Sequence, residues 1–156
     1  MLEAFDINMR HLRALPAIIA RGSVCAGAEA VSLSQPALTQ GLAKLERQLG
    51  TSLFERRSDG MVATAHGRAF ADRSAAVFRR LSRAVREAGG GSVRGFARAE
   101  LLMTATQLRA FLALVDAGSF VGAADATALS QPTLHRGVRD LEQVCGFPLV
   151  ERRGRR

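Results

Sequence analysis

The chain has 156 residues, 47% of them hydrophobic, and a formal charge of +8. This length allows one ordinary domain or two small ones near the lower limit for independent folding. No run of eighteen apolar residues and no signal pattern is present, so we expect a cytoplasmic protein that does not associate with membranes. The positive charge is concentrated, because residues 61–100 hold eight Lys or Arg against three Asp or Glu. A basic region of this kind favours an anionic partner.

The first predicted helix covers Met9 to Arg21 and ends at Gly22-Ser23. It has apolar residues at helical spacing: Leu12, Leu15, Ile18 and Ile19. Pro16 interrupts this pattern and predicts a bend or break. A short Ala-rich helix, Ala26 to Val31, follows, and its small side chains allow a close helix crossing.

A third helix is predicted to begin at Ser34, whose hydroxyl suits an N-cap, with Pro36 in the first turn. One side carries an apolar stripe for the core: Leu38, Leu42, Leu45 and Leu49. The opposite side, near the N-terminus, combines amide, hydroxyl and small side chains: Gln35, Thr39, Gln40 and Ala43. Such a face can approach base edges in a major groove, where Gln pairs with adenine through two hydrogen bonds.

Two short strands are predicted around the turn Ser58-Asp59-Gly60. Arg56 and Arg57 would project from this hairpin toward a phosphate backbone or a minor groove. Three helices and a two-stranded wing make a winged helix-turn-helix, whose third helix enters the major groove. We assign it to residues 1–63.

Residues 64–88 predict a long helix with a heptad seam. The seam consists of Phe70, Ser74, Val77, Leu81, Ala84 and Ala88, with Val85 beside it. It favours pairing of two subunits into a homodimer. A second interpretation stays open, in which the helix folds back on its own domain.

After a flexible linker, residues 89–103, much of the first domain recurs. A shift of 96 positions aligns His11–Gly60 with Gln107–Arg156, with about twenty of fifty residues identical. The predicted fold is therefore mainly α, with two tandem winged helix-turn-helix domains and a linker helix after the first. The second domain, residues 104–156, reaches the last printed residue at the turn of its wing, so we expect an incomplete wing there.

The two recognition faces differ, because His135 and Arg136 replace Thr39 and Gln40. If both faces bind DNA, they should prefer different sites. Candidate contacts in the second domain are Gln131, Pro132, Thr133, His135, Arg136, Arg152 and Arg153.

Several spaced motifs together resemble the N-terminal domain of LysR-type transcriptional regulators. They are Ser34-Gln35-Pro36-Ala37-Leu38, Leu45-Glu46, Leu49-Gly50, Leu53-Phe54-Glu55-Arg56 and Thr64-Ala65-His66-Gly67. The resemblance implies sequence-specific binding of double-stranded DNA and a linker helix that pairs two subunits. The candidate contacts of the first domain are Ser34, Gln35, Pro36, Ala37, Thr39, Gln40, Ala43, Lys44, Arg56 and Arg57.

Regulators of this family normally carry a larger ligand-binding domain, which we do not find within the printed residues, so no effector is predicted. Whether the sequence is a fragment of a longer regulator stays open. An alternative function is a dimerising partner that sequesters a full-length relative without binding DNA.

Enzymatic activity is not expected, because His11, His66 and His135 have no Cys or carboxylate partners at metal-ligand spacing and no phosphate loop is present. We therefore predict no catalytic residue, no metal and no cofactor. Cys25 and Cys145 do not correspond between the repeats, and we expect both to be buried free thiols.

Overall fold

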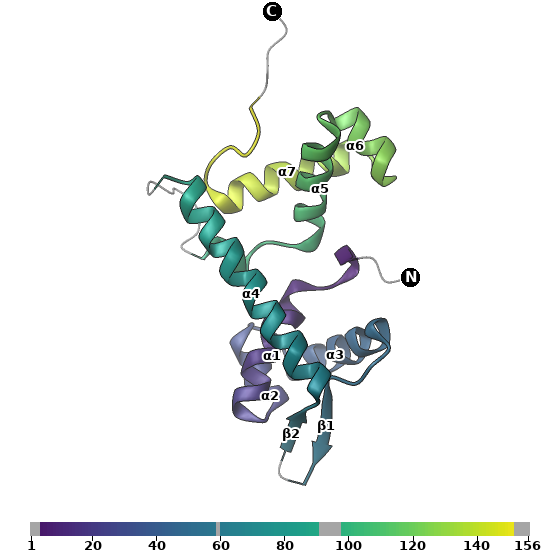
Figure 1. Cartoon of the computed structure of the whole chain (residues 1–156), viewed down its shortest axis with the longest axis vertical. Coiled ribbons are helices and arrows are strands. Elements are labelled where there is room, and N and C mark those ends of the chain that lie inside the picture. The colour runs from purple at the N-terminus through teal and green to yellow at the C-terminus, as the bar shows by residue number, and fades with distance from the viewer. Residues whose placement is uncertain (1–3, 59, 91–97, 152–156) are drawn as a thin grey trace, which may run out of the picture. The chain divides into compact units, whose positions relative to one another are not determined.

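The structure is a computed structural model that describes residues 4–58, 60–90 and 98–151. It is mainly helical, with one two-stranded sheet in the described part (Figure 1). The chain divides into two compact units, Met1–Arg80 and Leu81–Arg156, and the boundary falls inside the long helix α4. Each unit is described by itself.

The first unit contains three helices, a hairpin and the start of a fourth helix. In chain order its elements are η1 (Ala4–Asp6), α1 (Met9–Arg21), α2 (Val24–Ala30), α3 (Gln35–Leu49), β1 (Phe54–Arg57), β2 (Gly60–Ala63) and α4 (Ala65–Ala88). The predicted helices and wing are all present, and α2 begins two residues before the predicted start. Ser34 caps α3 as expected, since it accepts from the Ala37 amide, and Ser23 caps α2 in the same way through the Ala26 amide.

Pro16 does not break the first helix, contrary to one of the two outcomes that the sequence predicted. The helix α1 runs from Met9 to Arg21 with Pro16 inside it. Pro16 is exposed, whereas Leu15 and Ile18 are completely buried. Tertiary packing of the flanking residues therefore outweighs the local cost of the proline.

The core of the first unit forms where α1, α2 and α3 meet the hairpin and the start of α4. Three of the four predicted stripe leucines, Leu38, Leu42 and Leu45, are buried, and Leu49 packs against the cluster from a half-buried position. The remaining buried members are Ala14, Leu15, Ile18, Ala28, Val31, Leu53, Phe54, Ala63 and Ala71. The core thus fixes which side of α3 faces solvent.

The second unit repeats the helical part of the first. After η2 (Ala99–Leu101) it contains α5 (Ala105–Ala117), α6 (Phe120–Thr127) and α7 (Gln131–Cys145). The capping residues also recur, because Ser119 and Ser130 cap α6 and α7 just as Ser23 and Ser34 cap α2 and α3. The predicted second wing includes residues 152–156, which lie outside the described residues.

Two apolar clusters hold the second unit together. The cluster between α5, α6 and α7 contains Ala110, Leu114, Ala123, Leu134 and Val138. The other cluster, which we call the Cys145 cluster, consists of the buried residues Ala99, Met103, Leu141 and Cys145. Phe147, Leu149 and Val150 are half-buried and pack against these clusters.

The predicted pairing seam of α4 is only partly exposed. Phe70 packs against the core of the first unit, while Leu81 and Val85 pack against the Cys145 cluster. Ser74 is buried, and Val77, Ala84 and Ala88 face solvent.

The two cysteines differ in exposure. Cys145 is buried as expected, but Cys25 is exposed, so its predicted burial was wrong. Cys25 lies on the solvent side of α2, where its thiol contacts Glu29 one turn further on at 3.7 Å. The small residues Ala26, Gly27 and Ala28 take the buried positions of α2 instead.

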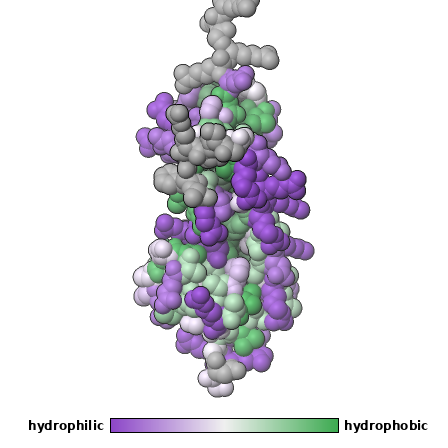
Figure 2. All heavy atoms as spheres, turned by 90° about the vertical axis from the view of Figure 1, so that its left-hand side faces the viewer, coloured by the Kyte–Doolittle hydropathy of each residue, from purple (hydrophilic) through white to green (hydrophobic). Residues whose placement is uncertain are grey.

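Hydrophilic residues cover much of the face shown in Figure 2, with smaller hydrophobic patches between them. The exposed large apolar side chains of the described residues are Val77, Leu102, Leu112, Val115 and Val121. In the part of the chain that the structure describes, no single helix has the length and apolar character needed to cross a membrane. The helices α5 and α6 together have the required length and apolar composition, but the chain bends by 115° between them.

Candidate nucleic-acid interface

The helix α3 exposes polar side chains near its N-terminus, beside its stripe of buried leucines. Gln35, Thr39 and Gln40 are exposed, and Ala43 is half-buried. The Thr39 hydroxyl donates to the Gln35 carbonyl oxygen at 2.9 Å. This bond uses the hydroxyl proton, so Thr39 offers outward an acceptor oxygen and a methyl group, which suits contact with a thymine methyl.

The N-terminus of α3 is exposed along with this face. Ser34, Pro36 and Ala37 are exposed there, and Lys44 is exposed two turns further along. The Ser34 oxygen accepts from the Ala37 amide at 3.3 Å, so Ser34 acts as the helix cap. A helix N-terminus carries partial positive charge and free amide groups, which favour a nearby phosphate.

A close crossing of α1 and α3 supports this face from behind. A methyl group at Gly41 would collide with the ring of His11 in its present position, so glycine allows this approach. The second unit repeats the arrangement, since a methyl group at Gly137 would lie 2.7 Å from the Ala110 methyl. Burial, and secondarily the charge of Lys44, lower the pKa of His11 below its ordinary value.

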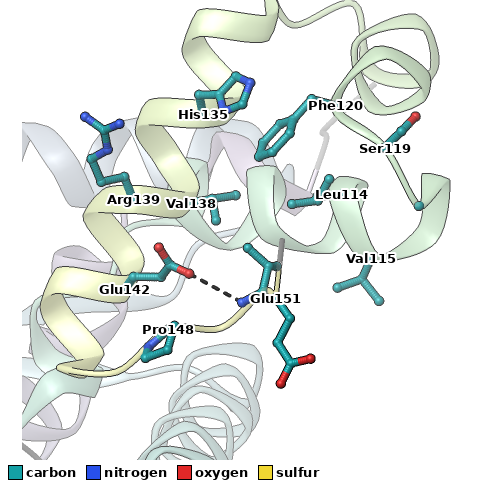
Figure 3. Close-up of a pocket in the computed structure, with 12 residues that line it drawn as sticks. Leu114, Val115, Ser119, Phe120, His135, Val138, Arg139, Glu142, Pro148 and Glu151 are labelled. Carbon is teal, nitrogen blue, oxygen red and sulfur yellow. Dashed lines mark hydrogen bonds between the residues drawn. The ribbon is translucent and has the colours of Figure 1, made fainter. Parts of the chain in front are cut away.

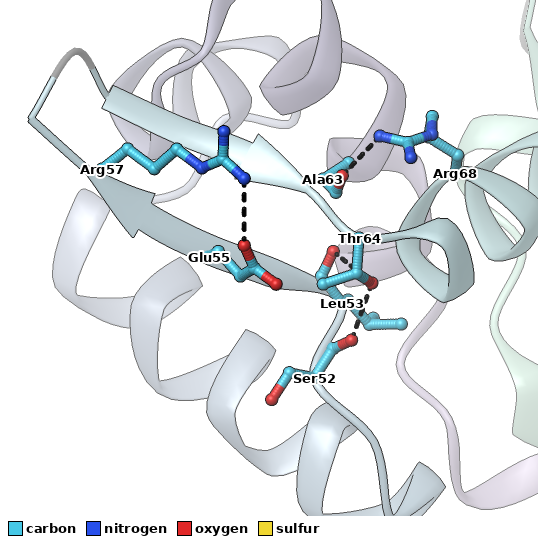
Figure 4. A network of polar contacts seen from close by, with 7 residues as sticks. All are labelled: Ser52, Leu53, Glu55, Arg57, Ala63, Thr64 and Arg68. Carbon is cyan, nitrogen blue, oxygen red and sulfur yellow. Dashed lines mark hydrogen bonds and ion pairs between the residues drawn. The ribbon is translucent and has the colours of Figure 1, made fainter.

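The hairpin places two arginines in solvent. In β1 both Arg56 and Arg57 are exposed, and antiparallel pairing sets Arg56 opposite Met61 in β2. One guanidinium nitrogen of Arg57 lies 3.5 Å from a carboxylate oxygen of Glu55 (Figure 4). An exposed ion pair of this length contributes little stability, so Arg57 can exchange Glu55 for a phosphate.

Polar contacts at the base of the wing anchor it to α4. The Thr64 hydroxyl lies 2.8 Å from the Ser52 carbonyl and 3.2 Å from the Leu53 carbonyl, and Arg68 donates to the Ala63 carbonyl (Figure 4). A methyl group at Gly67 would collide with the Leu53 carbonyl oxygen. These contacts therefore fix the base of the hairpin relative to the start of α4.

Glu46 is a structural residue whose role the sequence did not reveal. Its Oε1 accepts from the backbone amides of Leu53 at 2.7 Å and Phe54 at 3.2 Å, which ties the start of the wing to the end of α3. Glu142 does the same for Leu149 and Val150 in the second unit, at 2.9 and 3.4 Å. The recurrence of the Leu-Glu pair at the repeat spacing was the available signal.

The candidate face of the second unit is also exposed, but its chemistry differs. Gln131, Pro132, Thr133, His135 and Arg136 all face solvent. The His135 ring stacks on the Phe120 ring, with centroids 3.6 Å apart and planes at 21° (Figure 3). Val24 and Thr39 occupy the equivalent positions in the first unit, so the first unit has no counterpart of this stacked pair. Arg152 and Arg153 lie outside the described residues.

A groove of about 640 Å³ opens beside this stacked pair. Apolar side chains from α5, α6 and α7 line it together with Arg139 and Glu142, whose carboxylate accepts from the Val150 amide (Figure 3). At the equivalent place in the first unit, the Met61 amide donates to the Gly22 carbonyl at 2.9 Å. The groove thus corresponds to the space that β2 occupies in the first unit.

Neither unit gathers the groups of a metal site in its described part. No three His, Cys, Asp or Glu side chains lie close enough together there to hold a metal ion. Burial, and secondarily the charge of Glu142, raise the pKa of the Cys145 thiol. A raised pKa reduces the thiolate fraction that makes a cysteine reactive.

Comparison with known proteins identifies the family. The family model described as bacterial regulatory helix-turn-helix protein, LysR family, matches residues 9–68 and again residues 105–156. The transcriptional regulator CbbR of Sinorhizobium medicae is 42% identical over 72 residues, which cover 46% of this chain and 23% of CbbR. The regulator GalR of Pseudomonas putida is 31% identical over 157 aligned positions, covering 99% of this chain and 38% of GalR.

One solved structure shows the same type of fold. The LysR family regulator VV2_1132 aligns with 59% of this chain and 33% of its own length, at 21% identity and a TM-score of 0.51. The DNA-binding domain of CbnR, crystallised with DNA, covers 54% of this chain and 97% of that domain, at 28% identity and a TM-score of 0.49.

The chain spans about a quarter to two fifths of the length of the two curated relatives described above. Both matched segments coincide with the helices described here, and the first extends through the wing into α4. The chain belongs to the LysR family of bacterial helix-turn-helix regulatory proteins.

Proposed function

We propose that the first unit binds double-stranded DNA sequence-specifically and regulates transcription, with α3 inserted in the major groove. The observation that carries this proposal is the division of α3 into two sides. Leu38, Leu42 and Leu45 are buried in the core. By contrast, Gln35, Thr39 and Gln40 are exposed, and none of these three side chains is charged. Base edges can approach such a surface closely.

Within this proposal the wing positions the helix. Arg56 and Arg57 contact the flanking phosphate backbone, and the amides at the N-terminus of α3 contact another phosphate. The anchoring of the hairpin by Thr64 and Arg68 supports this role, because phosphate contacts fix the register of a protein on its site only if they are held rigidly. DNA binding also implies that the protein acts in the bacterial cytoplasm.

We further propose that the chain forms a homodimer through α4 on a pseudo-palindromic DNA site. We also propose that the second unit is a second winged helix-turn-helix domain that prefers a different DNA sequence. The alignment with GalR supports the tandem arrangement, since it runs through 99% of this chain and therefore through both units. The change from Thr39 and Gln40 to His135 and Arg136 supports a different preference, since Arg favours guanine.

The test is selection of bound duplexes from a random pool by the full chain. We expect the unmodified protein to enrich a site with two related halves. The double variant Gln35→Ala with Thr39→Ala should enrich this site roughly 10- to 100-fold less. Gln48→Ala, at the far end of the same helix, should enrich the original site. Equal enrichment by the double variant would assign recognition elsewhere. No enrichment by the unmodified protein would favour a sequestering role.

The same selection tests the second unit. If it contacts base edges, Arg136→Ala should remove or relax part of the enriched sequence while leaving the half-sites intact. An unchanged motif with Arg136→Ala would show that the second unit has no part in base recognition.

A further inference from the structure

The second half of α4 has a binding site within the second unit. The side chains of Leu81 and Val85 pack against the Cys145 cluster, together with five half-buried residues from the rest of that unit: Leu108, Phe111, Val144, Phe147 and Leu149. Cys145 is only 2% exposed beneath these side chains. The cluster is therefore completed by residues that precede the repeat in the sequence.

The equivalent surface of the first unit is covered by a different part of α4. There Ala71 belongs to the same buried cluster as Leu45 and Leu53, which are the counterparts of Leu141 and Leu149, and Phe70 packs against that cluster. Within each unit, a different segment of α4 thus covers the same surface of the helix-turn-helix repeat.

The second unit is also more apolar at this surface than the first. Val144 and Phe147 take the places of Gln48 and Thr51 at the repeat spacing of 96. In the first unit, Thr51 instead makes a polar contact with His66 at 3.5 Å. The apolar side chains of Val144 and Phe147 therefore match the apolar side chains of Leu81 and Val85 that pack on this surface.

This contact uses the largest apolar residues in the second half of the predicted pairing seam. With Leu81 and Val85 packed against the cluster, the exposed seam residues are Val77, at 45% exposure, and the small residues Ala84 and Ala88. One valine and two alanines bury too little apolar area to hold two helices together in water.

We propose that the second unit binds the second half of α4 within the same chain and so withholds Leu81 and Val85 from a second chain. Dimerisation through α4 requires release of this contact. The proposal rests on the pairing role assigned to α4 above, but the contact itself can be tested without DNA and without a dimer.

The first experiment measures how fast each cysteine of the full chain is alkylated. Cys25 is exposed and serves as the internal reference for Cys145. We expect Cys145 to react much more slowly than Cys25, and to react roughly tenfold faster or more in the double variant Leu81→Ser with Val85→Ser. The control Val77→Ser changes an exposed residue of the same helix and should leave the Cys145 rate unchanged.

Helix content by circular dichroism accompanies this measurement, because unfolding of the second unit would also expose Cys145. A faster Cys145 with retained helix content supports the contact. A Cys145 rate within about twofold of the unmodified rate in the double variant overturns it, as does a faster rate that appears only with loss of helix.

The second experiment measures the mass of the full chain by sedimentation equilibrium. The double variant Val144→Gln with Phe147→Thr installs the residues of the first unit, so it weakens the contact while leaving Leu81 and Val85 available. We expect this variant to dimerise at lower concentration than the unmodified chain. The control Val121→Gln, at a side chain that is 57% exposed, should behave like the unmodified chain. Unchanged or weaker dimerisation of the double variant overturns the proposed competition, whatever the outcome of the DNA selection.

Discussion

Removal of the Glu46 carboxylate should loosen the wing, because this one oxygen holds two backbone amides. Oε1 of Glu46 accepts from Leu53 at 2.7 Å and from Phe54 at 3.2 Å, and both residues are buried. Hydrogen bonds to a charged group contribute about 1.5–3 kcal/mol each, and a buried amide left without a partner costs about 1–3 kcal/mol. Since the two bonds share one acceptor and water can reach part of the site, we expect Glu46→Ala to cost about 2–4 kcal/mol of local stability.

Amide hydrogen exchange measured by NMR is the suitable assay, because the chain has no Trp or Tyr for fluorescence. A cost of about 2–4 kcal/mol corresponds to roughly 30- to 700-fold faster exchange at Leu53 and Phe54. The second unit supplies the control, since Glu142 holds Leu149 and Val150 in the same way and their exchange should not change.

The conservative variant Glu46→Gln keeps an acceptor oxygen and loses the charge, so its effect should be smaller. A change of less than about threefold at Leu53 and Phe54 in Glu46→Ala would refute the reasoning. Acceleration of all amides to the same extent would instead indicate global unfolding.

Three further predictions concern packing, protonation and charge. The pKa of His11 is lowered in the folded state, so the contribution of His11 to stability is present above about pH 6.5 and is lost as the pH falls through the lower folded pKa. Gln107 takes the place of His11 in the second unit. The variant His11→Gln should therefore flatten the pH dependence of the unfolding free energy measured by urea titration. Gly137→Ala should cost about 1–3 kcal/mol in thermal unfolding, because its methyl group would lie 2.7 Å from that of Ala110, and no change in midpoint would contradict this. Arg57→Ala should reduce the salt slope of log K for DNA by roughly one unit, whereas Glu55→Ala should leave the slope unchanged or raise it; an unaltered slope with Arg57→Ala would remove the arginine from the interface.

Local signals in the sequence were sufficient for much of the first unit. Ser34 caps α3, the leucine stripe lies in the core, and the turn after Arg57 separates two strands, because caps, periodicity and turn residues act within a few positions. Pro16 is the exception, since buried neighbours that the local pattern does not weigh hold the helix intact.

Contacts between distant residues were not predictable in the same way. Glu46 binds backbone amides seven and eight residues further on, and no side chain at those positions marks the bond. The stacking of His135 on Phe120 was partly detectable, because both positions differ between the repeats. The heptad pattern of α4 predicted an apolar face but could not specify what covers Leu81 and Val85.

The most direct test of the central claim compares two dissociation constants at fixed salt. The quantity is the dissociation constant for a scrambled duplex divided by that for the selected duplex. We predict a ratio of about a thousand or more for the unmodified chain. Gln35→Ala with Thr39→Ala should reduce this ratio by roughly 10- to 100-fold, with binding to the scrambled duplex unchanged. A ratio that is near one in the unmodified chain, or that the double variant leaves intact, would contradict recognition by α3.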